Sequence, residues 1–301
     1  MNDILWSMAD ACRRMATSAT LLSPGSEDYT VIQVSGPSRR AVEPGARRAR
    51  LTLRRSQALD RREGQSGERM LGRGPRRVGA TCAIAGSVLL FIGTYLHPLG
   101  ADPSEAVAAF TEYAADRLWI ATHLPQLAGV VLLVAALLCL ARQLESGSGT
   151  GWARLGAGGA IASLAVTTVL QAVDGIALKA LVDAWATASA GQKEPAFHAA
   201  FAVRQVEIGL ASVLGLLLGL TVTVYGVALL VDRTYPNWLG GLAIVGGVPT
   251  TVAGVLTAPR GFSRLAMATS MSAGLVLLVW MFILGVFMWR RGGVPPDQAA
   301  V

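Results

Sequence analysis

Long apolar runs alternate with short polar segments along the C-terminal three-quarters of the chain. Six of these runs approach or exceed about 20 residues, the length an α-helix needs to cross a hydrocarbon layer of about 30 Å. Helices are expected because lipid offers no hydrogen-bond partners to an open strand or loop. The predicted spans are 78–97, 118–141, 155–177, 205–231, 238–258 and 265–289.

Two connections between these spans carry helical patterns of their own. Asp102-Pro103-Ser104-Glu105 has the cap, proline and acid of a helix start, so a short helix is expected on the outer membrane surface. The third span is expected to continue through Lys179 to about Ser189 and to leave the lipid. Pro249 is expected to bend the fifth span.

The first 77 residues differ sharply from this apolar body. The chain of 301 residues is only 15% charged, yet residues 1–77 hold 15 of its 26 Lys and Arg and 8 of its 19 acidic residues. Such a stretch cannot bury enough apolar surface to fold, so it is predicted to be disordered. Met70 opens a basic segment directly before the first span, which makes residues 1–69 a candidate for a wrongly assigned extension. Residues 292–301 are predicted to be a short cytoplasmic tail.

Positive charge at both ends of the apolar region sets the expected orientation. Arg73, Arg76 and Arg77 precede the first span, and Arg290 and Arg291 follow the last. Six spans bring both groups to one side, and the positive-inside rule assigns that side to the cytoplasm. The expected location is a bacterial inner membrane, with both termini cytoplasmic. The lipid bilayer is the expected partner, and no nucleic-acid partner is expected because no folded basic module accompanies the charge.

Polar residues gather at one depth under this topology. Three spans each carry two polar residues three positions apart, which places both on one face of the helix. Polar groups are costly in lipid, so these faces are expected to turn toward the interior of the bundle. The predicted outer-leaflet cluster consists of His97, His123, Gln126, Gln171, Asp174, Arg204 and Glu207.

Three hypotheses for this cluster remain open. In a structural role, Asp174 pairs with Arg204, Glu207 bonds His123 or Arg204, and the two amides link helices. In the second hypothesis, the cluster is a proton- or ion-coupled transport site that faces the outer aqueous phase. The third is a metal-assisted membrane hydrolase, although the charge of Arg204 would oppose an ion. Its possible ligands are His97, His123, Asp174 and Glu207.

Familiar catalytic motifs are missing from the sequence. It contains no phosphate-binding Gly-x-x-x-x-Gly-Lys-Ser/Thr loop, no Gly-x-Ser-x-Gly elbow, no Cys-x-x-Cys and no His-Glu-x-x-His. We therefore assign no catalytic residue, metal or cofactor, and favour a non-enzymatic role over an enzymatic one. Gly215 and Gly219 form a small-xxx-small pattern that is expected to pack the fourth span within the same chain. The pattern does not define an oligomeric state.

The segment QAVDGIALKALVDAW at 171–185, followed by VRQVE at 203–207 and a glycine-rich span, resembles a group of uncharacterised bacterial multi-pass integral membrane proteins with a domain of unknown function. The resemblance covers roughly residues 75–290. It implies that Asp174, Arg204 and Glu207 belong to a shared framework, and it implies no activity.

The sequence thus predicts an all-α, six-helix transmembrane bundle at 78–291, preceded by a disordered basic tail. The leading functional hypothesis is small-solute or ion-coupled transport. The alternative is a structural or regulatory membrane component, and the metal-assisted hydrolase is third.

Overall fold

The computed structural model describes residue 74, residues 76–98 and residues 100–291, all within one compact unit, Arg61–Val301. Helices make up most of these residues, and no strand occurs among them. The predicted basic tail at 1–77 lies almost entirely outside the described residues, as does the predicted tail at 292–301.

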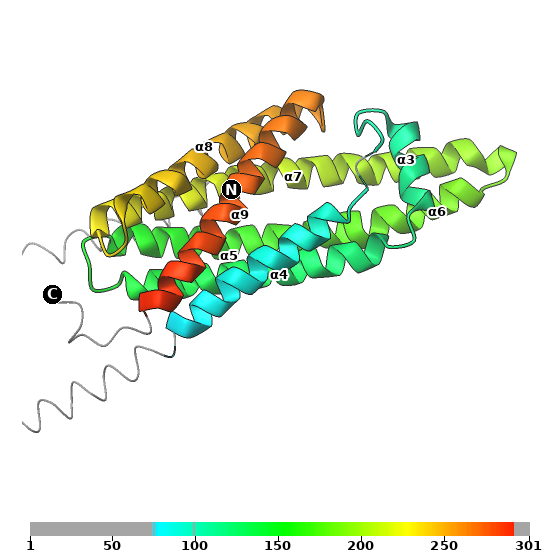
Figure 1. Cartoon of the computed structure of the whole chain (residues 1–301). Coiled ribbons are helices and arrows are strands. Elements are labelled where there is room, and N and C mark those ends of the chain that lie inside the picture. The colour runs from blue at the N-terminus through cyan, green and yellow to red at the C-terminus, as the bar shows by residue number, and fades with distance from the viewer. Residues whose placement is uncertain (1–73, 75, 99, 292–301) are drawn as a thin grey trace, which may run out of the picture. The chain divides into compact units, whose positions relative to one another are not determined.

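Six of the described helices are long and apolar enough to cross a membrane, which confirms the predicted transmembrane bundle. Their order along the chain can be followed in Figure 1. They are Arg76–Tyr95, α4 (Trp119–Gln143), α5 with its continuation (Thr150–Thr187), α7 (Ala190–Asp232), α8 (Asn237–Arg260) and α9 (Arg264–Arg291).

Two of these helices are far longer than a bilayer is thick. α5 (Thr150–Ala172), the π-helical segment η1 (Val173–Leu178) and α6 (Lys179–Thr187) form one rod of 38 residues, and α7 has 43 residues. At 1.5 Å per residue they measure about 57 Å and 64 Å, roughly twice the hydrocarbon thickness. Figure 1 shows α6 and the start of α7 continuing beyond the ends of α8 and α9.

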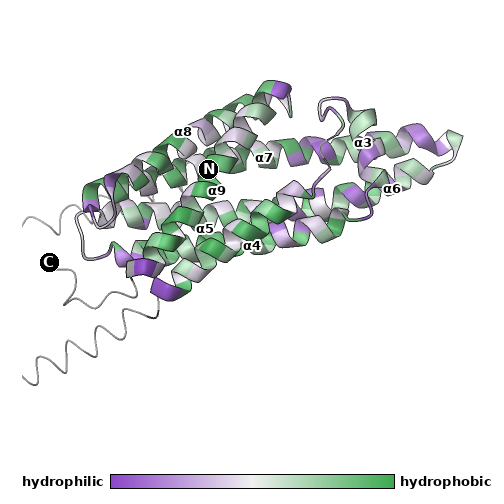
Figure 2. Ribbon diagram, in the orientation of Figure 1, coloured by the Kyte–Doolittle hydropathy of each residue, from purple (hydrophilic) through white to green (hydrophobic). Residues whose placement is uncertain are grey.

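These extensions form a small lobe with a core of its own. We call it the outer lobe, after the side of the membrane that the sequence predicts for it, and it consists of α3 (Ala106–Ala115), α6 and the first part of α7. Its buried residues include Phe110, whose ring lies 6.0 Å from that of Trp185 and 5.7 Å from that of Phe197. Figure 2 shows hydrophilic segments along this projecting part and at the opposite end of the bundle, with hydrophobic residues between them.

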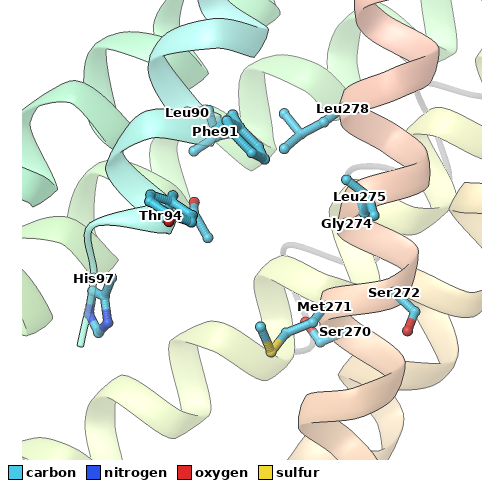
Figure 3. Close-up of a pocket in the computed structure, with 11 residues that line it drawn as sticks. Leu90, Phe91, Thr94, His97, Ser270, Met271, Ser272, Gly274, Leu275 and Leu278 are labelled. Carbon is cyan, nitrogen blue, oxygen red and sulfur yellow. The ribbon is translucent and has the colours of Figure 1, made fainter. Parts of the chain in front are cut away.

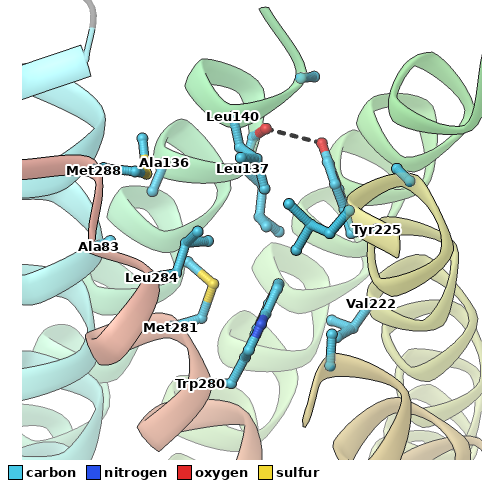
Figure 4. Close-up of a cluster of buried hydrophobic side chains, with 14 of the residues drawn as sticks. Ala83, Ala136, Leu137, Leu140, Val222, Tyr225, Trp280, Met281, Leu284 and Met288 are labelled. Carbon is cyan, nitrogen blue, oxygen red and sulfur yellow. Dashed lines mark hydrogen bonds between the residues drawn. The ribbon is translucent and has the colours of Figure 1, made fainter. Parts of the chain in front are cut away.

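The main core lies in the opposite half of the bundle and contains buried residues from all six spans, part of which Figure 4 shows. Trp280 is fully buried, and its indole N–H donates to the Leu239 carbonyl at 3.0 Å. The hydroxyl of Tyr225 donates to the Leu137 carbonyl at 2.9 Å. The polar atoms of both aromatic residues are therefore satisfied by backbone oxygens, as burial in lipid requires.

Glycines allow α7 and α8 to pack with their backbones nearly touching. A Cβ atom on Gly215 would lie 2.9 Å from the Cα of Gly254, and one on Gly219 would lie 2.6 Å from the Gly247 carbonyl oxygen. Without a hydrophobic force inside lipid, such close approach is what holds helices together. Both glycines singled out in the sequence thus face a helix of the same chain.

The first and last spans come together at one end of the bundle. A Cβ atom on Gly79 would meet Met288 of α9 and Cys139 of α4, and Figure 1 shows the start of the first span beside the end of α9. The six spans therefore bring the two ends of the described region to the same face of the bundle.

Candidate functional site

The residues of the predicted polar cluster come together where the bundle meets the outer lobe. They form three groups that hydrogen bonds and ring contacts define. We call His97, His123 and Asp174 the histidine–aspartate triad. The arginine network contains Arg204 and Glu207, and the amide bridge contains Gln126 and Gln171.

His123 and Asp174 form a buried pair between α4 and η1. The Nε2 atom of His123 lies 3.1 Å from Oδ2 of Asp174, and the Nδ1 atom lies 2.7 Å from the carbonyl oxygen of Trp119. A carbonyl oxygen only accepts, so Nδ1 carries a proton. The opposite nitrogen faces a second acceptor. The contact is therefore filled by a proton, on Nε2 or on the Asp174 carboxyl, or by a metal ion between the two groups.

His97 completes the triad from a non-helical turn after the Arg76–Tyr95 helix. Its ring centroid lies 5.1 Å from that of His123 and 4.9 Å from that of Trp119. Its Nδ1 atom is 3.0 Å from the carbonyl oxygen of Pro98, which fixes the proton on that nitrogen. Burial lowers the pKa of the His97 imidazole below its usual range, and the nearby Asp174 carboxylate opposes this shift.

The three side chains are close enough to share one metal ion. Each offers a ligand atom, and these atoms lie within 4.8 Å of one another. Ligand atoms around a tetrahedral zinc, at bonds of about 2.0–2.1 Å, are roughly 3.3 Å apart. His123 and Asp174 already have this separation. The widest separation would have to shorten by about 1.5 Å to match it. The backbone N–H of His97 donates to the Thr94 carbonyl at 3.3 Å, so this shift would come mainly from the His97 side chain.

A π-helical segment carries Asp174 to this position. η1 begins at Val173, directly before Asp174, and π-helical turns are rare and concentrate at functional sites. The indole N–H of Trp119 donates to the backbone carbonyl of Asp174 at 3.2 Å. Trp119, which lies next to His123, therefore also stabilises the backbone of η1. A Cβ atom on Gly175 would lie 3.1 Å from the His123 ring, so glycine at this position permits the close contact.

The arginine network differs from the predicted pairing. The sequence suggested an ion pair between Asp174 and Arg204, but Asp174 pairs with His123. Arg204 pairs with Glu207, one turn along α7, with Nη1 and Oε2 3.3 Å apart, which is one of the two contacts expected for Glu207. The prediction for Asp174 was wrong because helical spacing identifies a face but not the partner on the next helix.

Arg204 also links α7 to α3 and to the segment before α3. Its guanidinium donates to the Tyr113 hydroxyl at 3.1 Å and to the Pro103 carbonyl at 3.0 Å, and it lies over the rings of Tyr113 and Phe262. Burial raises the pKa of the Tyr113 phenol, so its hydroxyl keeps its proton. Only 3% of Arg204 is exposed, and each of these contacts offsets part of the cost of burying its charge.

The two amides link helices as the structural hypothesis proposed. Nε2 of Gln171 on α5 donates to Oε1 of Gln126 on α4 at 3.2 Å. This bond lies next to the triad along both helices and fixes α4 against α5.

A cavity of about 280 Å³ joins the triad to the arginine network. Its wall includes His97, Tyr113, Arg204, Glu207 and Met271. A ligand in this space would contact one imidazole, one guanidinium, one phenol and two carboxylates, because Glu112 also lines the cavity. The cavity is therefore able to accept a small polar group next to the triad.

Sequence reasoning missed or misjudged several residues of the site. Trp119, at the start of α4, is 1% exposed and stacks on His123 at 4.8 Å. Tyr113 and Gly175 were not singled out. The Asp174-Gly175 pair inside an apolar run was the one available signal for the irregular segment. His198 lies at the surface of α7, 3.8 Å from Glu194 and outside the site.

No protein-family model, curated protein or solved structure matches the chain. The resemblance to bacterial multi-pass membrane proteins stays a prediction.

Proposed function

We propose that this integral membrane protein binds one zinc or iron(II) ion at His97, His123 and Asp174 and uses it in hydrolysis. The observation that carries the proposal is the convergence of three ligand atoms within 4.8 Å, from three separate segments of the chain. Both imidazoles are anchored through Nδ1 to backbone carbonyls, which is how metal-binding histidines are commonly oriented.

The ligand set matches catalytic rather than purely structural metal sites. Structural zinc is usually closed by four protein ligands, whereas catalytic zinc has three and keeps one position for water. Two histidines and one carboxylate are also the ligands of many iron(II) sites. Of the three residues, His97 lines the cavity of about 280 Å³, so an ion held by them would lie next to this space.

The cavity wall supplies the other groups that hydrolysis needs. A bound metal lowers the pKa of its water to about 7. The cavity wall holds two carboxylates, and Glu112 accepts bonds from the Gly100 and Ala101 amides. Glu207 would therefore be the group that accepts a proton from the water and returns it to the leaving group when a carbonyl or phosphoryl bond is hydrolysed. Arg204 and Tyr113 can stabilise the negative charge that develops on the attacked group.

This proposal departs from the sequence-based expectation of no metal and of transport as the leading role. The charge of Arg204, which counted against an ion, is neutralised by Glu207 at 3.3 Å. A transport route would have to continue from the cluster through the rest of the bundle, where the main core packs around Trp280, Tyr225 and Leu284. No specific contact in the described residues favours transport over hydrolysis.

A structural role for the arginine network is our second candidate, and one observation favours it. Arg204 joins α7 to α3 and to the segment before it through bonds to Tyr113 and Pro103. This role is compatible with the metal site, because the network holds the lobe that covers the triad.

We also propose that the outer lobe and the metal site face away from the cytoplasm of a bacterial cell. The support is the cluster of arginines at both ends of the apolar region, Arg73, Arg76, Arg77, Arg290 and Arg291. Such clusters are retained on the cytoplasmic side of inner-membrane proteins.

Elemental analysis of the purified full-length chain tests the metal proposal. The protein is extracted in detergent without chelator, exposed to zinc or iron(II), and freed of unbound metal. We expect one ion per chain for the wild type. His123→Ala should retain at least about tenfold less metal. Loss of a contact that only orients a ligand already lowers metal affinity about tenfold or more, and loss of the ligand itself should lower it at least as much. Asp174→Asn keeps the size of the side chain and should behave like His123→Ala.

His198→Ala is the matched control, because His198 is an exposed histidine outside the triad. It should retain as much metal as the wild type. Equal metal in the wild type and His123→Ala, with both proteins eluting as folded species, would overturn the proposal. So would a wild-type protein that binds neither ion.

A further inference from the structure

An apolar trough runs along the surface of the bundle between the Arg76–Tyr95 helix and α9. The two helices touch at their cytoplasmic-side ends, where a Cβ atom on Gly285 would lie 2.9 Å from the Cβ of Ala83. They separate from there toward the triad. Figure 3 shows Leu90, Phe91 and Thr94 on one helix facing Met271, Leu275 and Leu278 on the other across the opening.

The trough is continuous over most of the length of these two helices. The part farther from the triad has a volume of about 270 Å³ and begins at Ser87 and Phe282. A larger part of about 710 Å³ shares Phe91, Leu275 and Leu278 with it and extends to His97. The two parts therefore form one path from the interior of the apolar region to the triad.

At its polar end the trough reaches the cavity beside the metal site. His97 and Met271 belong to the walls of both spaces. The lining is apolar at the end farther from the triad, where it includes Val88, Phe91 and Phe282. It becomes polar and charged at the other end, where it includes His97, Arg204 and Glu207. A ligand that fills this path has an apolar tail and a polar head.

The trough opens on the side that faces lipid. Phe91, Met271 and Leu275 are 52%, 49% and 54% exposed on the bundle surface, within helices that span the membrane. A water-soluble substrate would have no path to this opening, whereas a bilayer component diffuses to it laterally. A spanning helix of a second copy could cover the mouth but could not enter the inner cavity of about 280 Å³.

We infer that the trough holds one acyl chain of a membrane amphiphile and that its head lies in the cavity beside His97, Arg204 and Glu207. This inference rests on the proposed function, because it names the substrate class of that site. The bond to be hydrolysed would be an ester, amide or phosphoester in the head, next to the point where the chain enters the trough.

Gly274 offers a way to fill the trough without touching the metal ligands. It lines the larger part, and a Cβ atom on it would meet nothing within 4 Å. Gly274→Leu therefore places a branched side chain in the path of the acyl chain. Gly158→Leu is the matched control, because Gly158 lies on α5 within a spanning segment, also meets nothing within 4 Å, and is remote from the trough.

The experiment titrates palmitoyl lysophosphatidylcholine onto the full-length protein in detergent and counts bound molecules by native mass spectrometry. The same samples are analysed for metal. We expect the wild type and Gly158→Leu to bind one molecule with equal affinity, and Gly274→Leu to bind it at least about tenfold more weakly, as overfilling of a packed space would cause. The metal content of all three should be equal.

The outcomes separate the two proposals. Equal lipid binding by Gly274→Leu and the wild type overturns the acyl-chain inference, whatever the metal content. Weaker lipid binding by Gly274→Leu supports the inference even if no protein holds metal, and in that case the metal proposal alone fails. A mass spectrum in which the wild type is a dimer without lipid and Gly274→Leu is a monomer also overturns the inference, because the trough is then a helix–helix interface.

Discussion

The imidazole of His123 is held between a backbone carbonyl and a carboxylate, with Trp119 stacked on its face. The contact between His123 and Asp174 is filled by a proton, on either group, or by a metal ion. A metal ion would also engage His97, whose ring lies 5.1 Å from that of His123, whereas a proton would engage only His123 and Asp174. This difference is the physical reason for preferring a metal site over a simple ion pair.

Gly175→Ala tests the tight contact between η1 and His123. The added Cβ atom would lie 3.1 Å from three atoms of His123 and should push the ring away from its metal-binding position. We expect metal affinity to fall about tenfold or more, in the range seen when contacts that orient a ligand are lost. Zinc titration by calorimetry measures the effect. Gly158→Ala, on the same rod with open space at its Cβ, is the control and should leave affinity unchanged.

Arg204→Ala tests the arginine network as a structural element. The substitution removes the partner of Glu207 and leaves a buried carboxylate unpaired, which costs about 3–5 kcal/mol of stability. Arg204→Lys retains the charge and should lose less. Thermal unfolding in detergent compares the two variants with the wild type. An Arg204→Ala protein that unfolds at the wild-type temperature would rule out a structural role for this network.

The sequence was sufficient to bring the site residues together but not to pair them. Spacing of three positions and a common depth gathered His123, Asp174 and Arg204 correctly. The partner of Asp174 depended on the rotation of η1 relative to α4, which a helical pattern of 3.6 residues per turn does not contain. The role of Trp119 is equally hidden in the sequence, since an aromatic residue at a helix end fits both a lipid interface and a buried site.

α7 and α8 are joined along a seam of glycines that lets their backbones approach. Gly219 and Gly247 meet there, as do Gly226 and Gly240, where a Cβ on either residue would lie 2.8 Å from the carbonyl of the other. The seam fixes the half of α7 that lies in the membrane, while Arg204 fixes the half that projects from it.

Gly219→Ala should weaken this seam. The new Cβ atom would lie 2.6 Å from the carbonyl oxygen of Gly247 and would also meet the Thr251 amide, and backbone atoms cannot move aside cheaply. We expect a loss of about 1–3 kcal/mol, as for other overpacked cores. Gly209→Ala lies on the same helix with open space and should be neutral or slightly stabilising. Equal melting temperatures for the two variants would mean that the seam is not tightly packed.

Helix ends were harder to predict than helix cores. The apolar pattern located all six spans, because hydrophobicity is needed wherever lipid surrounds the chain. It stopped at Gln205 for the fourth span, yet α7 begins at Ala190. The extra turns are buried against α3 and α6 by Phe197 and Ala200 rather than by lipid, so their signal is that of a soluble helix and is weaker.

The molecule divides across the membrane into an apolar bundle with a basic face and a lobe on the opposite face. The described ends of the first and last spans lie on the basic face, and the triad lies under the lobe. In the orientation that we propose, the triad would be reached from the outer leaflet or from the outer aqueous phase.

Cysteine labelling of intact cells tests this orientation. Gly191→Cys introduces a thiol at the exposed tip of the lobe, and Ser146→Cys introduces one in the exposed α4–α5 connection on the basic face. A membrane-impermeant maleimide should label Gly191→Cys in intact cells and Ser146→Cys only after lysis, because the positive-inside rule keeps the basic face in the cytoplasm. The reverse pattern would show that the protein has the opposite orientation.

X-ray absorption spectroscopy of the zinc-loaded protein examines the ligands themselves. If His97, His123 and Asp174 hold the ion, the spectrum should show nitrogen and oxygen ligands at about 2.0–2.1 Å, with outer-shell scattering from two imidazoles that is lost in His123→Ala. Sulfur at about 2.3 Å would instead mean that a cysteine such as Cys82 or Cys139 binds the zinc, and would contradict the proposed site.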